Sequence, residues 1–342
     1  ALAVLFYFGG QLMESSVIAL ELYFEHRNYV PALLMFWPLG LWLCGARIPG
    51  ASPAREPAAD SHVLRTALAL AIPLGLAVLT YMRADLWGKP QDQALIWALK
   101  NPDSPRAQAY AAQIEMARGN NAAAVARLQR ALAAQPDEIQ LALNLIGARC
   151  ATGGVSREDL AHAAYALRNA PNTGRLGYDW FERGLPTALA GTCPGLDLAS
   201  ISTLLDAASE NKRTRDIPGR KQDVLHLKGR VALLRHEDER ALELFDAAFA
   251  ADPRPGAGLD QAAILGSAGK PELALRHLDY MEHVAKPPSK PGFSMATVHQ
   301  WLLWREGYWP HEIAHLRATL AEDIARKSEK NEDPTHDAAI SG

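Results

Sequence analysis

The chain has 342 residues, of which 49% are hydrophobic and 21% are charged, and its formal net charge is -3. Because there is no excess of Lys and Arg to neutralise phosphates, this balance argues against a nucleic-acid-binding protein. The average composition hides a division, since apolar residues crowd into residues 1–85 and charged residues into the remainder. The sequence predicts an all-α chain in two parts, a membrane segment followed by a helical solenoid.

Three apolar stretches lie in the membrane segment, at about 1–13, 29–46 and 63–82. A helix that crosses a bilayer needs roughly 20 mainly apolar residues, so the second and third stretches are long enough and the first is cut short. The sequence therefore predicts two to three transmembrane helices. The alternative, buried helices of a soluble protein, is disfavoured because 33–43 is apolar on all sides. The chain begins inside an apolar run without Met, and we expect it to be the C-terminal part of a longer polytopic protein.

The short connections suggest an orientation in the membrane. Residues 47–65 carry three arginines and several prolines, and Lys and Arg are concentrated in cytoplasmic loops. Placing this loop in the cytoplasm puts residues 14–28 and everything after residue 82 on the periplasmic or an equivalent lumenal side. Arg83 and Lys89 oppose this assignment.

Titratable and aromatic residues gather at the boundary of the second span. Glu25, His26, Arg27 and Tyr29 follow one another closely there. Ionisable residues at membrane depth are costly and often functional, which makes these four residues candidates for a functional site. The alternative is that they only anchor a helix end among the lipid headgroups.

Repeated helix pairs are predicted over residues 91–327. Tetratricopeptide repeats pair two helices every 34 residues, with small residues where the helices cross and Pro at the end. The clear units, 105–138 and 222–255, have small residues at positions eight, twenty and twenty-seven: Ala112, Ala124 and Ala131, then Gly229, Ala241 and Ala248. Units 139–172 and 255–288 match less well. A coiled coil or plain bundle shares the helical period but does not require these positions.

Between the clear units, residues 174–220 contain many Gly and Pro residues, from which we expect a single helix at 198–208 and connections elsewhere. Solenoids of this kind present the first helix of each repeat to a concave surface, so a protein partner is the predicted ligand. Four basic side chains around 226–235, with His226 and Arg230 as the partner-binding candidates, would form a basic groove there. The alternative is a solvated helix face.

Residues 14–31, followed by spanning helices and these repeats, resemble the C-terminal part of bacterial transmembrane and tetratricopeptide-repeat O-mannosyltransferases, with Glu25, Arg27, Tyr29 and Pro31 as the closest match. The resemblance implies a glycosyltransferase of the GT-C class in the inner membrane, which uses a polyprenyl-phosphate sugar. It makes Glu25, His26, Arg27 and Tyr29 the candidates for the lipid-phosphate or sugar site, while the catalytic acids would precede residue 1. It also implies that the periplasmic repeats bind an acceptor or partner protein. The alternative is a non-enzymatic membrane-anchored scaffold. No cofactor is predicted.

Two further features bear on the site. Cys150 and Cys193 lie near helix breaks in the repeats, and either form a disulfide, if that region is periplasmic, or remain as two buried free thiols. His311 and His315 complete the pattern His-Glu-x-x-His, in which two His one turn apart bind zinc. We treat them as weak metal candidates, because adjacent tryptophans suggest that this segment is instead a hydrophobic cap of the solenoid. A zinc metalloprotease is therefore the third functional hypothesis, after the glycosyltransferase and the scaffold. Residues 328–342 are polar and are predicted to be disordered.

Overall fold

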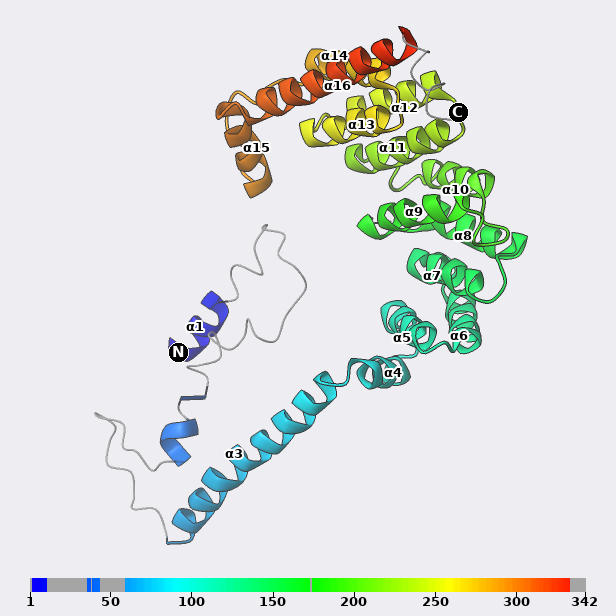
Figure 1. Cartoon of the computed structure of the whole chain (residues 1–342). Helices are drawn as coiled ribbons and strands as arrows, with labels where there is room; N and C mark the ends of the chain where they lie inside the picture. Colours follow the sequence, from blue (N-terminus) through cyan, green and yellow to red (C-terminus); the bar gives the residue numbers. More distant parts are fainter. Residues whose placement is uncertain (1, 11–35, 38, 44–58, 173, 333–342) are drawn as a thin grey trace, which may run out of the picture. The chain divides into compact units, whose positions relative to one another are not determined.

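The computed structural model of the protein describes residues 2–10, 36–37, 39–43, 59–172 and 174–332 (Figure 1). Within these ranges the chain forms α-helices joined by turns and has no β-strand. This confirms the predicted all-α class. The chain divides into two compact units, one ending at Gln93 and one beginning at Ala94.

The first unit contains α1 (Leu2–Gly10) and α3 (Ala59–Trp87). In α3, the segment Val63–Trp87 contains an 18-residue window with a mean hydropathy of 1.9 in which no part counts as buried, and it is the one helix in the described ranges long and apolar enough to cross a membrane. The predicted span 63–82 lies inside it. Pro73 is accommodated within the helix, as is common in membrane helices. Most of the predicted span 29–46 lies outside the described residues, so the predicted number of spans stays a prediction.

The second unit is a series of helices that pack on their neighbours in chain order. Figure 1 shows them stacked from α5 to α14, after the short α4 (Pro90–Lys100). The helices are α5 (Pro105–Ala117), α6 (Asn121–Ala134), α7 (Ile139–Cys150), α8 (Arg157–Asn169), α9 (Gly174–Leu189), α10 (Leu198–Ser209), α11 (Pro218–Leu234), α12 (Asp238–Ala251), α13 (Pro255–Ser267), α14 (Pro271–Val284), α15 (Met295–Arg305) and α16 (Tyr308–Glu332).

Local sequence explains where many of these helices begin. Proline occupies the first turn of α5, α11, α13 and α14, where its fixed φ suits the helix and its missing N–H costs nothing. Capping boxes start α8, α10 and α15, at Ser156, Asp197 and Ser294. In each box the capping side chain accepts a hydrogen bond from the backbone three residues on.

Small residues lie where paired helices meet. Ala112 and Ala124 are fully buried between α5 and α6, and Ala262 and Ala274 between α13 and α14. In the pair α11–α12, a methyl group added to Gly229 would lie 2.7 Å from the ring of Phe245. The small residues counted along the sequence are therefore those that let each pair of helices approach closely.

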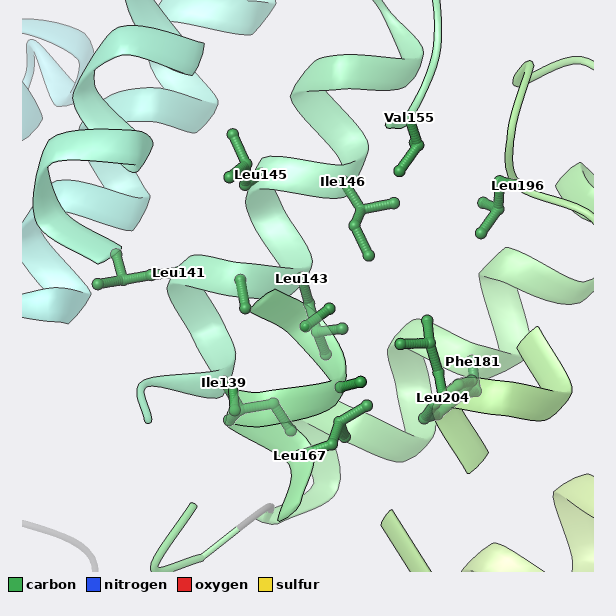
Figure 2. Close-up of a cluster of buried hydrophobic side chains, with 14 of the residues drawn as sticks. Ile139, Leu141, Leu143, Leu145, Ile146, Val155, Leu167, Phe181, Leu196 and Leu204 are labelled. Carbon is green, nitrogen blue, oxygen red and sulfur yellow. The ribbon is translucent and has the colours of Figure 1, made fainter. Parts of the chain in front are cut away.

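Two main hydrophobic clusters run through the stack, one from α5 to α11 and one from α11 to α16. Figure 2 shows the centre of the first, where side chains of α7 meet those of α8, α9 and α10. Leu141, Leu143, Leu145 and Ile146 are each at most 2% exposed. Since consecutive positions of α7 are buried, this helix is covered on several sides by α5, α6, α8 and α9.

The expected connections at 174–197 are wrong in part, because α9 fills most of this stretch despite an internal proline. Its Phe181 and Leu185 are buried in the first cluster, and Trp180 Nε1 donates a hydrogen bond of 3.1 Å to the carbonyl of Leu143 on α7. Pro186 is exposed and falls in the last turn, where it disturbs few backbone hydrogen bonds. At the other end of the unit, α16 continues to Glu332, beyond the expected boundary at residue 327.

A disulfide joins Cys150, the last residue of α7, to Cys193 in the loop between α9 and α10, with 4.9 Å between their Cα atoms. The two loops also touch through their backbones, as Val155 N donates a hydrogen bond of 2.8 Å to Pro194 O. A Cβ on Gly195 would lie 2.1 Å from Val155 O, and φ at this glycine is +84°. The crosslink thus holds two loops that already pack tightly.

Candidate functional site

Five polar side chains converge from three helices that begin successive pairs, α9, α11 and α13. These helices lie on one side of the stack, and α8, α10 and α12 on the other (Figure 1). Tyr178 and Glu182 are one turn apart on α9, and His226 and Arg230 are one turn apart on α11, so each pair shares a helix face. Asp260 joins them from α13. We call these five residues the first-helix cluster.

One ion pair links α9 to α11 in this cluster. Arg230 Nη1 donates a hydrogen bond to Glu182 Oε2, and both side chains are about one-quarter exposed. The other carboxylate oxygen, Glu182 Oε1, lies 3.9 Å from His226 Nε2, which is too long for a hydrogen bond. Both atoms are buried, and neither has a hydrogen-bond partner within the described residues. The cluster thus leaves two adjacent polar atoms unsatisfied.

The electrostatics of the cluster follow from burial and from an imbalance of charge. Burial lowers the pKa of His226 to about 4, with further contributions from Arg230 and His277, so the imidazole is neutral at pH 7. Asp260 is an exposed residue of α13, and partial desolvation together with the charge of Glu182 raises the pKa of its carboxyl, against the opposing effect of Arg230. Burial, Glu182 and Asp260 raise the pKa of Tyr178. Glu182 and Asp260 are therefore both close enough to Tyr178 for their charges to raise the pKa of its phenol.

A buried hydrogen-bonded chain extends from the cluster to α14. Gln261 Nε2 lies 3.4 Å from His226 Nδ1, and Gln261 Oε1 lies 3.0 Å from His277 Nε2. His277 Nδ1 lies 2.6 Å from Asp246 Oδ1 on α12. Gln261 and His277 are fully buried. The imidazole of His226, which α11 carries, is thus positioned by a chain of side chains from α13, α14 and α12.

This chain has two consistent arrangements of protons. In the first arrangement, Gln261 Nε2 donates to His226 Nδ1, and Gln261 Oε1 accepts a hydrogen bond from His277 Nε2. Because Asp246 also accepts a hydrogen bond from His277 Nδ1, His277 then carries a proton on each ring nitrogen. Turning the amide over exchanges its oxygen and nitrogen, and the surrounding hydrogen bonds accommodate this second orientation as well. His277 is then neutral, His226 carries its proton on Nδ1, and His226 Nε2 becomes a bare acceptor.

The residues predicted for the partner site lie in this cluster, but their surroundings differ from the expected basic groove. His226 is 6% exposed and packs against the rings of Tyr178 and Phe245. Among its basic neighbours, Arg230 pairs with Glu182, and Lys228 Nζ lies 2.8 Å from Asp206 Oδ1. The acidic partners come from α9 and α10, far away in the sequence. Only Glu182, Asp260 and Tyr178 were missed entirely, and a helical reading of 174–189 would have revealed two of them.

The other candidates are placed as follows. Glu25, His26, Arg27 and Tyr29 lie outside the described residues. His311 and His315 are exposed on α16. Within the described ranges no group of three or more His, Cys, Asp or Glu side chains is arranged to hold a metal ion.

Two surface pockets lie elsewhere in the second unit. One, of about 390 Å³, is bordered by Arg149 and Asp159, which pair with each other at 3.3 Å. The second, of about 440 Å³, is bordered by Arg220 and Lys228, which pair with acidic residues outside its lining. Since no residue bordering either pocket has a buried polar atom without a partner, whereas Glu182 and His226 do, the first-helix cluster is the better candidate site. Comparison of the chain with protein-family models and with curated proteins finds no match.

Proposed function

We propose that the second unit is a tetratricopeptide-type solenoid that binds an extended segment of a partner or acceptor protein on the side formed by α9, α11 and α13. The observation that carries the proposal is the close approach of α11 and α12, where the ring of Phe245 occupies the space that a Cβ on Gly229 would take. Stacked repeats of this kind present their first helices to ligands. The first-helix cluster supplies polar groups on that side.

We further propose that α3 anchors this solenoid to a membrane, with the repeats on the non-cytoplasmic side. The length and hydropathy of Val63–Trp87 support a spanning helix. The disulfide between Cys150 and Cys193 supports an oxidising compartment such as the periplasm, because disulfides are rare in the reducing cytosol. A partner would therefore be met outside the cytoplasm, close to the membrane.

Site-specific photocrosslinking in intact membranes tests partner binding. A benzophenone amino acid replaces Tyr178 on α9, and the same amino acid replaces Glu239 as a control. Glu239 is 68% exposed and belongs to α12, a helix on the other side of the stack (Figure 1). We expect a partner adduct from position 178 and none from position 239. Equal crosslinking from both positions, or none from either, would contradict partner binding on the first-helix side.

A second proposal rests on residues 14–31, whose resemblance to membrane O-mannosyltransferases suggests that the full-length protein transfers a sugar from a polyprenyl-phosphate carrier. Arg27 is the candidate for contact with the lipid phosphate, because a guanidinium presents a planar pair of donors to phosphate oxygens. We expect Arg27→Ala to abolish glycan transfer by the full-length protein at unchanged expression, while Arg47→Ala, in the following loop, leaves transfer intact. Normal transfer by Arg27→Ala would remove this residue from the site.

A further inference from the structure

The first-helix cluster carries one negative charge more than its own cation neutralises. Glu182 gives one carboxylate oxygen to Arg230 and leaves Oε1 without a partner. Asp260 takes part in none of the ion pairs formed between described residues, although it lies near enough to Glu182 for that charge to raise its pKa. Two carboxylates therefore face one guanidinium, and the balance favours a cation.

His226 supplies an independent sign that the cluster is incomplete. Its side chain is 7% exposed, and its Nε2 points to within 3.9 Å of Glu182 Oε1 without a hydrogen bond to any described residue. Buried polar atoms in proteins almost always have partners. Two such atoms side by side, one of them on a carboxylate whose side chain is 27% exposed, leave hydrogen-bonding capacity that a ligand group reaches by displacing the side chains that cover them.

We propose that the first-helix cluster binds a basic side chain, Lys or Arg, of the extended partner segment, with Glu182 Oε1 and the Asp260 carboxylate accepting its hydrogen bonds. The inference rests on the peptide-binding function proposed above. A single positive charge balances the site. A divalent metal ion fits less well, because Arg230 already holds Glu182 and the described residues offer no set of three metal-ligating side chains.

The buried chain behind His226 allows it to accept this ligand. When the Gln261 amide turns over, His277 becomes neutral and His226 Nε2 becomes an acceptor, so a bound ammonium or guanidinium meets three acceptors instead of a competing N–H. Tyr178, whose ring lies 5.8 Å from that of His226, adds an aromatic surface beside the cation. An acidic side chain in the same place would face Glu182 and Asp260 and be repelled.

A selection from a phage-displayed library of random twelve-residue peptides, on the full chain in lipid nanodiscs, tests the proposal. The selection is repeated on the double variant Glu182→Gln with Asp260→Asn. The matched control is Glu239→Gln with Glu243→Gln, which removes the same two charges from exposed positions of α12. For one selected peptide, affinity is then compared with that of a counterpart in which norleucine replaces the basic residue.

We expect Lys or Arg to be enriched at one position of the peptides selected by the wild-type chain and by the control variant, and not by the Glu182→Gln, Asp260→Asn variant. Replacing that residue by norleucine should weaken binding to the wild-type chain roughly tenfold or more. Selected peptides without a basic preference, or an unchanged affinity with norleucine, would overturn the proposal and leave peptide binding standing. If no peptide is selected, the peptide-binding function itself fails. Should the double variant not fold, the norleucine comparison on the wild-type chain decides alone.

Discussion

Replacing Gly229 by Ala tests whether α11 and α12 meet as closely as a repeat of this type requires. A Cβ at this position would lie 2.7 Å from two ring atoms of Phe245 and 3.2 Å from a third. Phe245 is fully buried, and the rings of His226 and His277 lie 5.6 and 6.3 Å from its centre. The aromatic ring therefore has little room to move away, and the helices must separate or the ring must leave its preferred position.

Two opposing effects set the magnitude. Overpacking a buried contact costs about 1–3 kcal/mol, whereas Ala in place of Gly inside a helix stabilises by about 1 kcal/mol. Gly147, inside α7, isolates the second effect because it is exposed and a Cβ there meets nothing within 4 Å. We expect Gly147→Ala to stabilise the chain and Gly229→Ala to destabilise it by up to about 2 kcal/mol, so that the two variants differ by the overpacking cost of about 1–3 kcal/mol.

Urea unfolding of the full chain in detergent micelles, followed by circular dichroism, compares the two variants. Amide hydrogen exchange then shows whether the loss of stability is located in α11 and α12. A smaller residue at position 245 should relieve the clash, so Phe245→Leu should cost less in the Gly229→Ala background than in the wild type. If Gly229→Ala stabilises the chain as much as Gly147→Ala does, α11 and α12 do not approach each other as closely as described.

Further predictions address the crosslink, a helix cap and the histidine pair. The disulfide closes a loop with a sequence separation of 43, and the chain-entropy relation then gives a stabilisation of about 4 kcal/mol. Replacing Cys150 and Cys193 by Ser should remove it in urea unfolding, and two alkylatable thiols in the unreduced protein would contradict the crosslink. Burial disfavours the charged form of Asp159, but hydrogen bonds from Ser156 and the charge of Arg149 outweigh burial and hold its pKa below 3.8. Its stabilising effect is therefore present at neutral pH and is lost as pH falls through the lowered pKa. Asp159→Asn should cost about 1 kcal/mol at pH 7 and progressively less below about pH 4, whereas a cost independent of pH would refute the ionic contribution. Zinc in the purified chain should stay well below one equivalent, and stoichiometric zinc lost in His311→Ala would instead support a metal site on α16.

Local sequence was sufficient to predict the helix pairs of the clear units and the small residues at their crossings. Small residues at fixed spacings, such as Ala112 and Ala124, are buried at helix crossings because only they let two helices approach within a repeat. In the structure, proline and capping residues set helix starts through backbone hydrogen bonding that spans a few residues. By contrast, α9 was missed, since glycines and Pro186 disfavour a helix locally. Burial of Phe181 and Leu185 against α7 and α10 outweighs that preference.

The sequence likewise predicted part of the candidate site, namely two of its residues, but not the charge of their surroundings. The sequence singled out His226 and Arg230 as polar residues on the first helix of a strong repeat, and both lie in the first-helix cluster. It predicted the opposite charge for their surroundings, because Glu182 precedes Arg230 by 48 positions and was assigned to a connection. The charge of a surface assembled from several helices depends on which residues the stacking brings together.

What the sequence determined by itself was short in range: an apolar stretch long enough to cross a bilayer, helix pairs, and the small residues at which paired helices meet. Only the tertiary structure decided that α9 joins the stack, that Glu182, His226 and Asp260 meet, and that His226 Nε2 and Glu182 Oε1 lie together without partners. The physical reason is that helix formation and capping depend on neighbours within one or two turns, whereas burial, pKa and unsatisfied hydrogen bonds depend on residues that the stacking of separate repeats places side by side.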